Sequence, residues 1–295
     1  MGWPPRRILA ATDFSPSATA AVRSAAALAR RSGASLELVH VLPAAPPFLV
    51  GYEPLDALLL RRDDAASAHA RAKALLEELA RELGCERCQI HLPEGVAAIE
   101  VLALREKLQI DLVALGAAGQ RGGLRRFLLG SVADRALRHP GPPLLLVREA
   151  PPSGEFKKLV IAHELPSQST PWLELGMRLA HDERSEVVLV HVLPPRGYAS
   201  DPHHVDLDTE HTPARLAGLV ARTAPTIPTQ IDVRRGDPAH EIPAAAREHG
   251  AHVVVIGAER NARGWPGRIA DRVAREGLPA ILFVWPESES AEEFE

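Results

Sequence analysis

Short apolar runs alternate with longer amphipathic stretches along the whole chain. In the first half, the apolar runs at 7–15, 35–42, 89–92, 111–115 and 143–147 predict strands. Stretches of helical periodicity or helix start signals lie between them, at 19–32, 63–83 and 97–108 and from residue 132 onward. Because continuous apolar strands are typical of parallel sheets buried on both faces, this alternation predicts a doubly wound α/β fold.

The pattern of the first half starts again after residue 155. Five segments of the first half have similar counterparts in the second half, in the same order. The pairs are 6–13 and 157–164, 37–43 and 186–194, 94–100 and 235–242, 111–116 and 252–257, and 143–147 and 279–284. We therefore predict two five-stranded, mostly parallel domains in tandem, at 1–148 and 156–286, with a linker at 149–155 and an acidic tail at 287–295. Each fifth strand would otherwise be an exposed apolar edge, so the two domains should pack against one another within the chain.

Composition and charge narrow the classes of function. The 295 residues carry a net charge of −4 without a basic stripe, which argues against a nucleic-acid partner. No apolar run reaches the eighteen or so residues that span a bilayer, and the first residues lack the apolar segment of a secretion signal. We expect a cytoplasmic protein with no membrane partner.

A glycine-bearing loop follows the fourth strand. Gly116 and Gly119 end the strand, and Gly130 and Ser131 precede a helix. Glycines at a strand end, followed by Gly-Ser at a helix start, present free backbone N–H groups to an anion. The spacing is neither G-x-G-x-x-G nor the P-loop pattern, so neither a Rossmann dinucleotide site nor a P-loop explains it.

The loop, the opening segment I-L-A-A-T-D-F-S at 8–15 and the ending L-L-G-S-V-A-D-R-A-L-R-H from 128 onward resemble the universal stress protein family. ATP-binding members carry G-x-x-G, nine residues and then G-Ser or G-Thr. Here the intervening run is one residue longer, an insertion that a bulge around Gly122 and Gly123 can absorb. The resemblance covers nearly the whole chain and implies a tandem protein with a layered fold similar to the adenine nucleotide alpha hydrolases.

The same resemblance implies a ligand, ATP, with or without Mg²⁺. In the family's arrangement Asp13 lies near the adenine or ribose, Thr12 and Val41 lie along the base, and the glycines surround the sugar and phosphates. The implied nucleotide-binding residues are Thr12, Asp13, Val41, Leu115, Gly116, Gly119, Gly130, Ser131 and Val132. A stress-response regulator that forms a homodimer of tandem chains is the implied class, and the sequence identifies no protein partner.

Helix capping and core packing are alternative explanations for several of these residues. Ser131 is a favoured residue for capping a helix, and an aspartate after a strand, such as Asp13, often caps the next helix. Val41 would be a core residue without any nucleotide. The longer loop also leaves open a scaffold in which the site has lapsed.

The second repeat departs from the binding pattern. Arg260 stands where the second glycine belongs, and the segment 261–268 offers no Gly-Ser pair at the expected distance. Only glycine allows close backbone approach at low cost, so we expect this repeat to support the first rather than bind nucleotide. Opposite charge suggests an ion pair between Arg260 and Glu164.

Catalysis is the alternative class of function. A weak ATPase or another nucleotide-processing enzyme would need groups placed for proton or phosphoryl transfer. Arg125 and Arg126 are the nearest candidates for a cationic clamp, and no catalytic residue is assigned. We expect slow ATP hydrolysis at most.

Two further clusters contain residue types that bind metals or form redox pairs. Cys85 and Cys88 have the spacing of half a zinc site or a redox dithiol, but no second pair completes four ligands. His203, His204 and His211 lie in a polar segment whose spacing matches no rigid site. We expect two reduced thiols and no metal.

Overall fold

The computed structural model describes residues 3–43, 55–85, 87–118, 129–165, 170–195, 211–258 and 267–286. The first repeat contains β1 (Arg7–Ala11), α1 (Pro16–Ser32), β2 (Ser35–Val39), α2 (Leu55–Glu82), β3 (Cys88–His91), α3 (Ala97–Lys107), β4 (Leu112–Gly116), α4 (Ser131–Arg138) and β5 (Leu144–Val147). The second contains β6 (Lys158–Ala162), α5 (Thr170–Glu183), β7 (Glu186–Leu193), α6 (Thr212–Thr223), β8 (Thr229–Arg235), α7 (Pro238–Glu248), β9 (Val253–Gly257), α8 (Arg268–Ala274) and β10 (Ala280–Val284).

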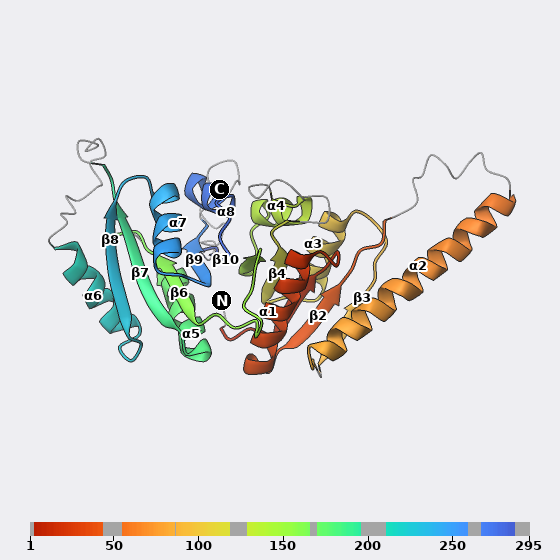
Figure 1. Cartoon of the computed structure of the whole chain (residues 1–295), viewed down its shortest axis with the longest axis horizontal. Coiled ribbons are helices and arrows are strands. Elements are labelled where there is room, and N and C mark those ends of the chain that lie inside the picture. Colours follow the sequence, from red (N-terminus) through yellow and green to blue (C-terminus); the bar gives the residue numbers. More distant parts are fainter. Residues whose placement is uncertain are drawn as a thin grey trace, which may run out of the picture.

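The ten strands form one continuous sheet in the order β3-β2-β1-β4-β5-β10-β9-β6-β7-β8. Neighbouring strands are parallel within each repeat, and the repeats join through an antiparallel pair in which Leu144 of β5 lies opposite Phe283 of β10. The prediction that the fifth strands bring the repeats together is confirmed. Each apolar edge is thereby paired within the chain, as Figure 1 shows at the centre of the molecule.

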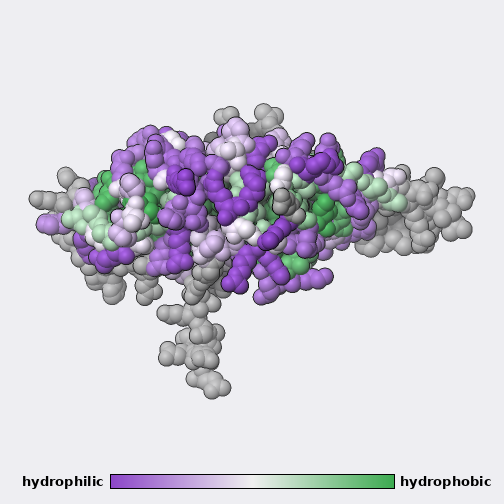
Figure 2. Space-filling view, turned by 90° about the horizontal axis from the view of Figure 1, so that it is seen from below, coloured by the Kyte–Doolittle hydropathy of each residue, from purple (hydrophilic) through white to green (hydrophobic). Residues whose placement is uncertain are grey.

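Helices cover both faces of this sheet. The core on one face is built from apolar residues of α1, α2, α5 and α6, and the core on the other face from residues of α3, α4, α7 and α8. Strand residues alternate between the two cores: Ile8 and Ala10 lie in the first, and Leu9 lies in the second. The outer surface seen in Figure 2 is mostly hydrophilic, with small separate hydrophobic areas.

The helix expected at 63–83 is longer in the structure, where α2 begins at Leu55. The segment 44–62, which precedes the expected helix, contains prolines in its first part. Its last eight residues instead contain leucine, alanine, aspartate and arginine without proline or glycine, a composition that allows the helix to start earlier. Leu76 and Ala72, near the C-terminal end, are buried against the sheet, while the other end of α2 extends away from it (Figure 1).

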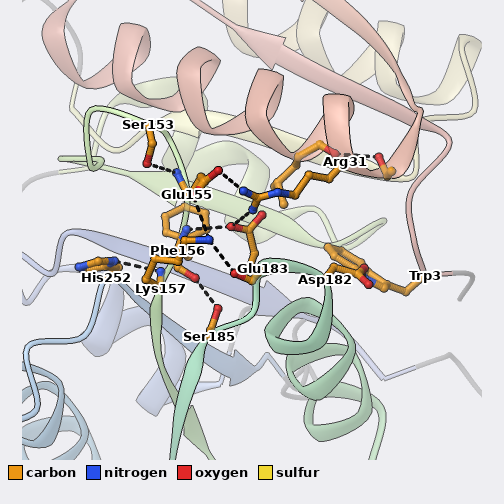
Figure 3. A network of polar contacts seen from close by, with 12 residues as sticks. Trp3, Arg31, Ser153, Glu155, Phe156, Lys157, Asp182, Glu183, Ser185 and His252 are labelled. Atoms are coloured by element: carbon orange, nitrogen blue, oxygen red, sulfur yellow. Dashed lines mark hydrogen bonds and ion pairs between the residues drawn. The ribbon is translucent and has the colours of Figure 1, made fainter.

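Polar contacts also hold the repeats together (Figure 3). Arg31 of α1 forms ion pairs with Glu155, which follows β5, and with Glu183 of α5. The indole N–H of Trp3 donates to Asp182 at 2.9 Å. On the other face, the guanidinium of Arg275, the C-cap of α8, donates to Asp134 of α4 at 3.0 Å and to Asp271 of α8 at 2.9 Å. The Arg138 and Arg275 guanidiniums beside Asp134 hold the pKa of that carboxyl below its usual range.

Candidate functional site

A turn after β1 positions Thr12 and Asp13 at the carboxyl end of the sheet. The Thr12 amide donates to Val39 of β2 at 2.9 Å, and its hydroxyl accepts from the Phe14 amide at 2.9 Å. The Asp13 carboxylate accepts from the Ser15 amide at 3.0 Å. Ser15 is the N-cap of α1, with its hydroxyl accepting from the Ala18 amide at 3.3 Å. The capping role considered for Asp13 therefore belongs to Ser15.

The end of β2 forms the neighbouring wall. The Nδ1 atom of His40 contacts the Thr12 carbonyl oxygen at 2.8 Å, and its ring lies 4.8 Å from that of Phe14. These contacts fix the chain as it leaves β2. Val41, the next residue, is partly exposed and lines the same hollow as Asp13, so its side chain is not simply part of the core.

Gly116 ends β4 against the start of α1. A Cβ atom at this position would lie 2.6 Å from the Ala18 backbone nitrogen, a distance that no real side chain tolerates. The glycine therefore lets β4 and the first turn of α1 meet. The hydroxyl of Ser17 donates to the carbonyl of Ala118 and ties the same two elements together.

Both ends of the glycine loop are held at Ala117. The Ala117 amide donates to Val147 of β5 at 2.9 Å, and the Gly130 amide donates to the Ala117 carbonyl at 2.9 Å. Gly119, Gly122, Gly123, Arg125 and Arg126 lie outside the described residues. The extra residue of the loop thus falls between two anchored ends.

Gly130 is the N-cap of α4, and no side chain caps this helix. Ser131 is the first residue of α4 and is exposed. Because the N-cap position is occupied by Gly130, the structure does not support Ser131 as the capping residue. The first N–H groups of an α-helix have no partner within the helix. In α4 these amides, together with the Ser131 hydroxyl, are donors available to an anion at the cavity.

These segments enclose a cavity of about 140 Å³. Apolar side chains that the sequence reasoning missed, including Ala18, Ala97 and Val101, complete its walls. The apolar periodicity of the third helix was the only sequence signal for Val101. Every described member of the predicted set lines this cavity: Thr12, Asp13, Val41, Leu115, Gly116, Gly130, Ser131 and Val132.

The second repeat has an equivalent cavity of about 440 Å³. Much of its lining corresponds to that of the first cavity, with Glu164 for Asp13, Val192 for Val41 and Gly257 for Gly116. Gly267 is the N-cap of α8, as Gly130 is of α4. The match between Gly267 and Gly130 was not predicted, because no serine follows Gly267. An Ala-Asp-Arg triplet that begins three residues after each glycine could have indicated it. Arg260 lies outside the described residues, so its pairing with Glu164 stays a prediction.

The remaining candidate sites from the sequence are the cysteine pair and the histidine cluster. Cys85 and Cys88 are free, half-buried thiols, and burial raises the pKa of Cys88 to about 12. Among the described residues no three His, Cys, Asp or Glu side chains gather as a metal site, and His203 and His204 lie outside those residues. No described helix combines the length and apolarity needed to cross a bilayer.

Comparison with known proteins agrees with this architecture. The universal stress protein family matches residues 5–148 and, a second time, residues 155–277. The chain therefore belongs to the universal stress protein family and carries two of its domains in tandem.

Individual relatives cover one repeat or both. A universal stress protein of Methanocaldococcus jannaschii is 29% identical over 148 residues, which is 49% of this chain and 82% of the relative. A universal stress protein A homolog of Coxiella burnetii is 32% identical over 132 residues, 45% of this chain and 88% of the relative. The crystal structure of a universal stress protein from Archaeoglobus fulgidus has the same tandem fold, with a TM-score of 0.71 at 14% identity over 96% of this chain and 99% of that one.

Proposed function

We propose that this chain is a regulatory protein that binds ATP in its first repeat, with the second repeat as support and internal pairing partner. The observation that carries the proposal is the convergence of eight predicted residues on one cavity at the carboxyl ends of β1 and β4. Ligands of open α/β sheets bind in the crevice outside the strand ends, which is where this cavity lies.

Each wall has a role in the proposal. Val41 and Leu115 offer apolar surface to the adenine, and the Asp13 carboxylate accepts a hydrogen bond from the ribose or the base. Gly116 lets the end of β4 meet the first turn of α1, and Gly116 and Ala18 both line the cavity. A cavity of about 140 Å³ is smaller than the roughly 300–1,000 Å³ of pockets for drug-sized ligands, so it takes the base end of the nucleotide.

The phosphates then extend toward the start of α4. There the Ser131 hydroxyl and the first-turn amides supply donors, and the positive end of the helix dipole favours negative charge. Mg²⁺, where present, would arrive with the nucleotide. In this proposal, ATP binding regulates by changing the contacts that the chain makes with a protein partner. We also propose that two tandem chains form a homodimer.

Mass spectrometry of nucleotide released from the purified, denatured protein tests the proposal. We expect ATP from the wild type and none from the variant Gly130→Val combined with Ser131→Ala, because the substitutions crowd the helix start and remove a phosphate donor. Gly267→Val, the matched change at the equivalent glycine of repeat two, should leave the yield of ATP unchanged.

Assays of the same proteins in the folded state separate an ATP-binding regulator from a slow ATPase and from a ligand-free scaffold. Accumulation of ADP from added ATP, lost in the double variant, would indicate a slow ATPase. A wild type that carries no nucleotide and shows no heat of ATP binding would contradict the proposal and favour a scaffold.

A further inference from the structure

The cavity of the second repeat differs from that of the first in size and chemistry. At about 440 Å³ it lies within the range of pockets that enclose small molecules. Its described walls are mostly apolar and come from β6, β7, β9, α5, α7 and α8: Ala162, Trp172, Val190, Ile242, Ile256 and Ile269. It is thus large enough to enclose most of an organic ligand rather than one end of it.

Trp172 gives this cavity an aromatic wall. The side chain is 5% exposed, and its indole N–H donates to the Ala162 carbonyl at 3.2 Å. Its ring packs on Gly257, where a Cβ atom would lie 2.7 Å from ring carbons. A tryptophan held by both a hydrogen bond and close packing offers a fixed apolar surface at little entropic cost to a ligand.

Substitutions between the repeats make the second cavity less suited to a nucleotide. Ile242 stands in place of Val101, and Pro238 in place of Ala97. A purine or ribose enclosed by such walls would leave polar groups without hydrogen-bond partners, which costs free energy. An apolar ligand incurs no such cost.

The polar groups of the lining are few. His163 replaces Thr12, and burial lowers its pKa to about 4, so the imidazole is neutral at pH 7. Glu164 is exposed at the end of β6. Arg268 replaces Ser131, is exposed, and forms no ion pair with any residue that the structure describes. Among the described lining residues, Arg268 is therefore the one cation that can form an ion pair with an acidic group of a ligand.

We infer that the repeat-two cavity binds a small organic acid with an apolar body, the body against Trp172 and the apolar walls and the acidic group at Arg268. A triphosphate is disfavoured because it would place several negative charges on one cation near the Glu164 carboxylate. This inference does not depend on ATP binding in the first repeat.

Titration with 8-anilinonaphthalene-1-sulfonate, an aromatic monoanion, tests the inference on the full chain. Direct excitation of the probe avoids interference from protein tryptophans. We expect one probe per chain with a Kd in the micromolar range. Val192→Trp, at a partly exposed position of the wall, should fill the cavity and weaken binding at least tenfold. Val41→Trp, the matched change in repeat one, should leave probe binding unchanged.

Charge at Arg268 is tested separately, because this exposed residue can be changed without disturbing the core. Arg268→Gln should weaken the anionic probe about fivefold and leave the neutral probe N-phenyl-1-naphthylamine unaffected. Arg272→Gln, one turn further along α8 and paired with Asp237, is the control that should change neither. Wild-type protein that does not bind the probe, equal binding in Val192→Trp, or displacement of the probe by ATP would overturn the inference.

Discussion

Arg31 of the first repeat forms an ion pair with Glu183 of the second, a carboxylate that is only 1% exposed (Figure 3). The Glu183 carboxylate also accepts from the Phe156 amide at 3.2 Å, at the point where the chain enters β6. The Lys157 ammonium donates to the Glu183 carbonyl at 2.8 Å. One buried acid therefore joins α1, the start of repeat two and α5.

Arg31→Met should lower the free energy of unfolding by about 2–3 kcal/mol, because a buried carboxylate loses its cation. The cost stays below that of a fully buried pair since Arg31 is 28% exposed. Urea unfolding followed by circular dichroism measures it. Arg30→Met is the control: Arg30 donates to the Leu83 carbonyl and pairs with no buried acid in the described structure, so its loss should cost less than about 1 kcal/mol. Equal costs for the two variants would refute the role assigned to Glu183.

Stability should fall as the pH drops below about 6.5, because of His163. Burial, with His191 close by, lowers the pKa of the folded-state imidazole to about 4, whereas the unfolded chain binds the proton near its usual pKa of 6.5. Between these values the unfolded state binds more protons, so the free energy of unfolding decreases by up to about 1.4 kcal/mol per pH unit. Above pH 6.5 both states are neutral and this contribution vanishes.

His163→Thr, which installs the residue of the first repeat, should reduce the slope of stability against pH between 6.5 and 5. Thermal melts at several pH values compare the two proteins. Burial also lowers the pKa of His191, so a smaller slope should remain in the variant. A slope that is identical in wild type and variant would contradict a buried, neutral His163.

The two thiols should react slowly in the folded protein. Burial raises the pKa of Cys85 and raises that of Cys88 to about 12, so little thiolate exists at pH 8. We expect modification by 5,5′-dithiobis(2-nitrobenzoate) to be at least tenfold slower in buffer than in urea. Rapid reaction of the native protein would instead indicate an activated redox dithiol, the reading that the sequence left open.

Much of the fold follows from local pattern. Parallel strands buried on both faces require continuous apolar runs, so the runs at 7–15 and 111–115 located β1 and β4 within a few residues. Part of the site was predictable for a related reason: at Gly116 a Cβ atom would clash with the first turn of α1, so packing restricts this position to glycine. Such constraints leave a signature in the sequence.

Other features depend on contacts between distant segments and left a weaker signature. Ala18 joins the cavity because α1 meets the end of β4, and Trp172 lines the second cavity because its ring rests on Gly257. The contact between the fifth strands was predicted from their apolar edges, but the antiparallel direction of the β5–β10 pair depends on how the repeats dock. The start of α2 at Leu55 was missed because prolines just before it suggested an irregular segment.

The most direct test of the account is the stoichiometry of ATP binding, measured by isothermal titration calorimetry on the full chain and two matched variants. The account predicts one ATP per chain, with Asp13→Ala weakening binding at least fivefold and Glu164→Ala, the equivalent change in repeat two, leaving the affinity unchanged. Saturation at two nucleotides per chain, loss of binding in Glu164→Ala, or no heat of binding in the folded wild type would contradict it.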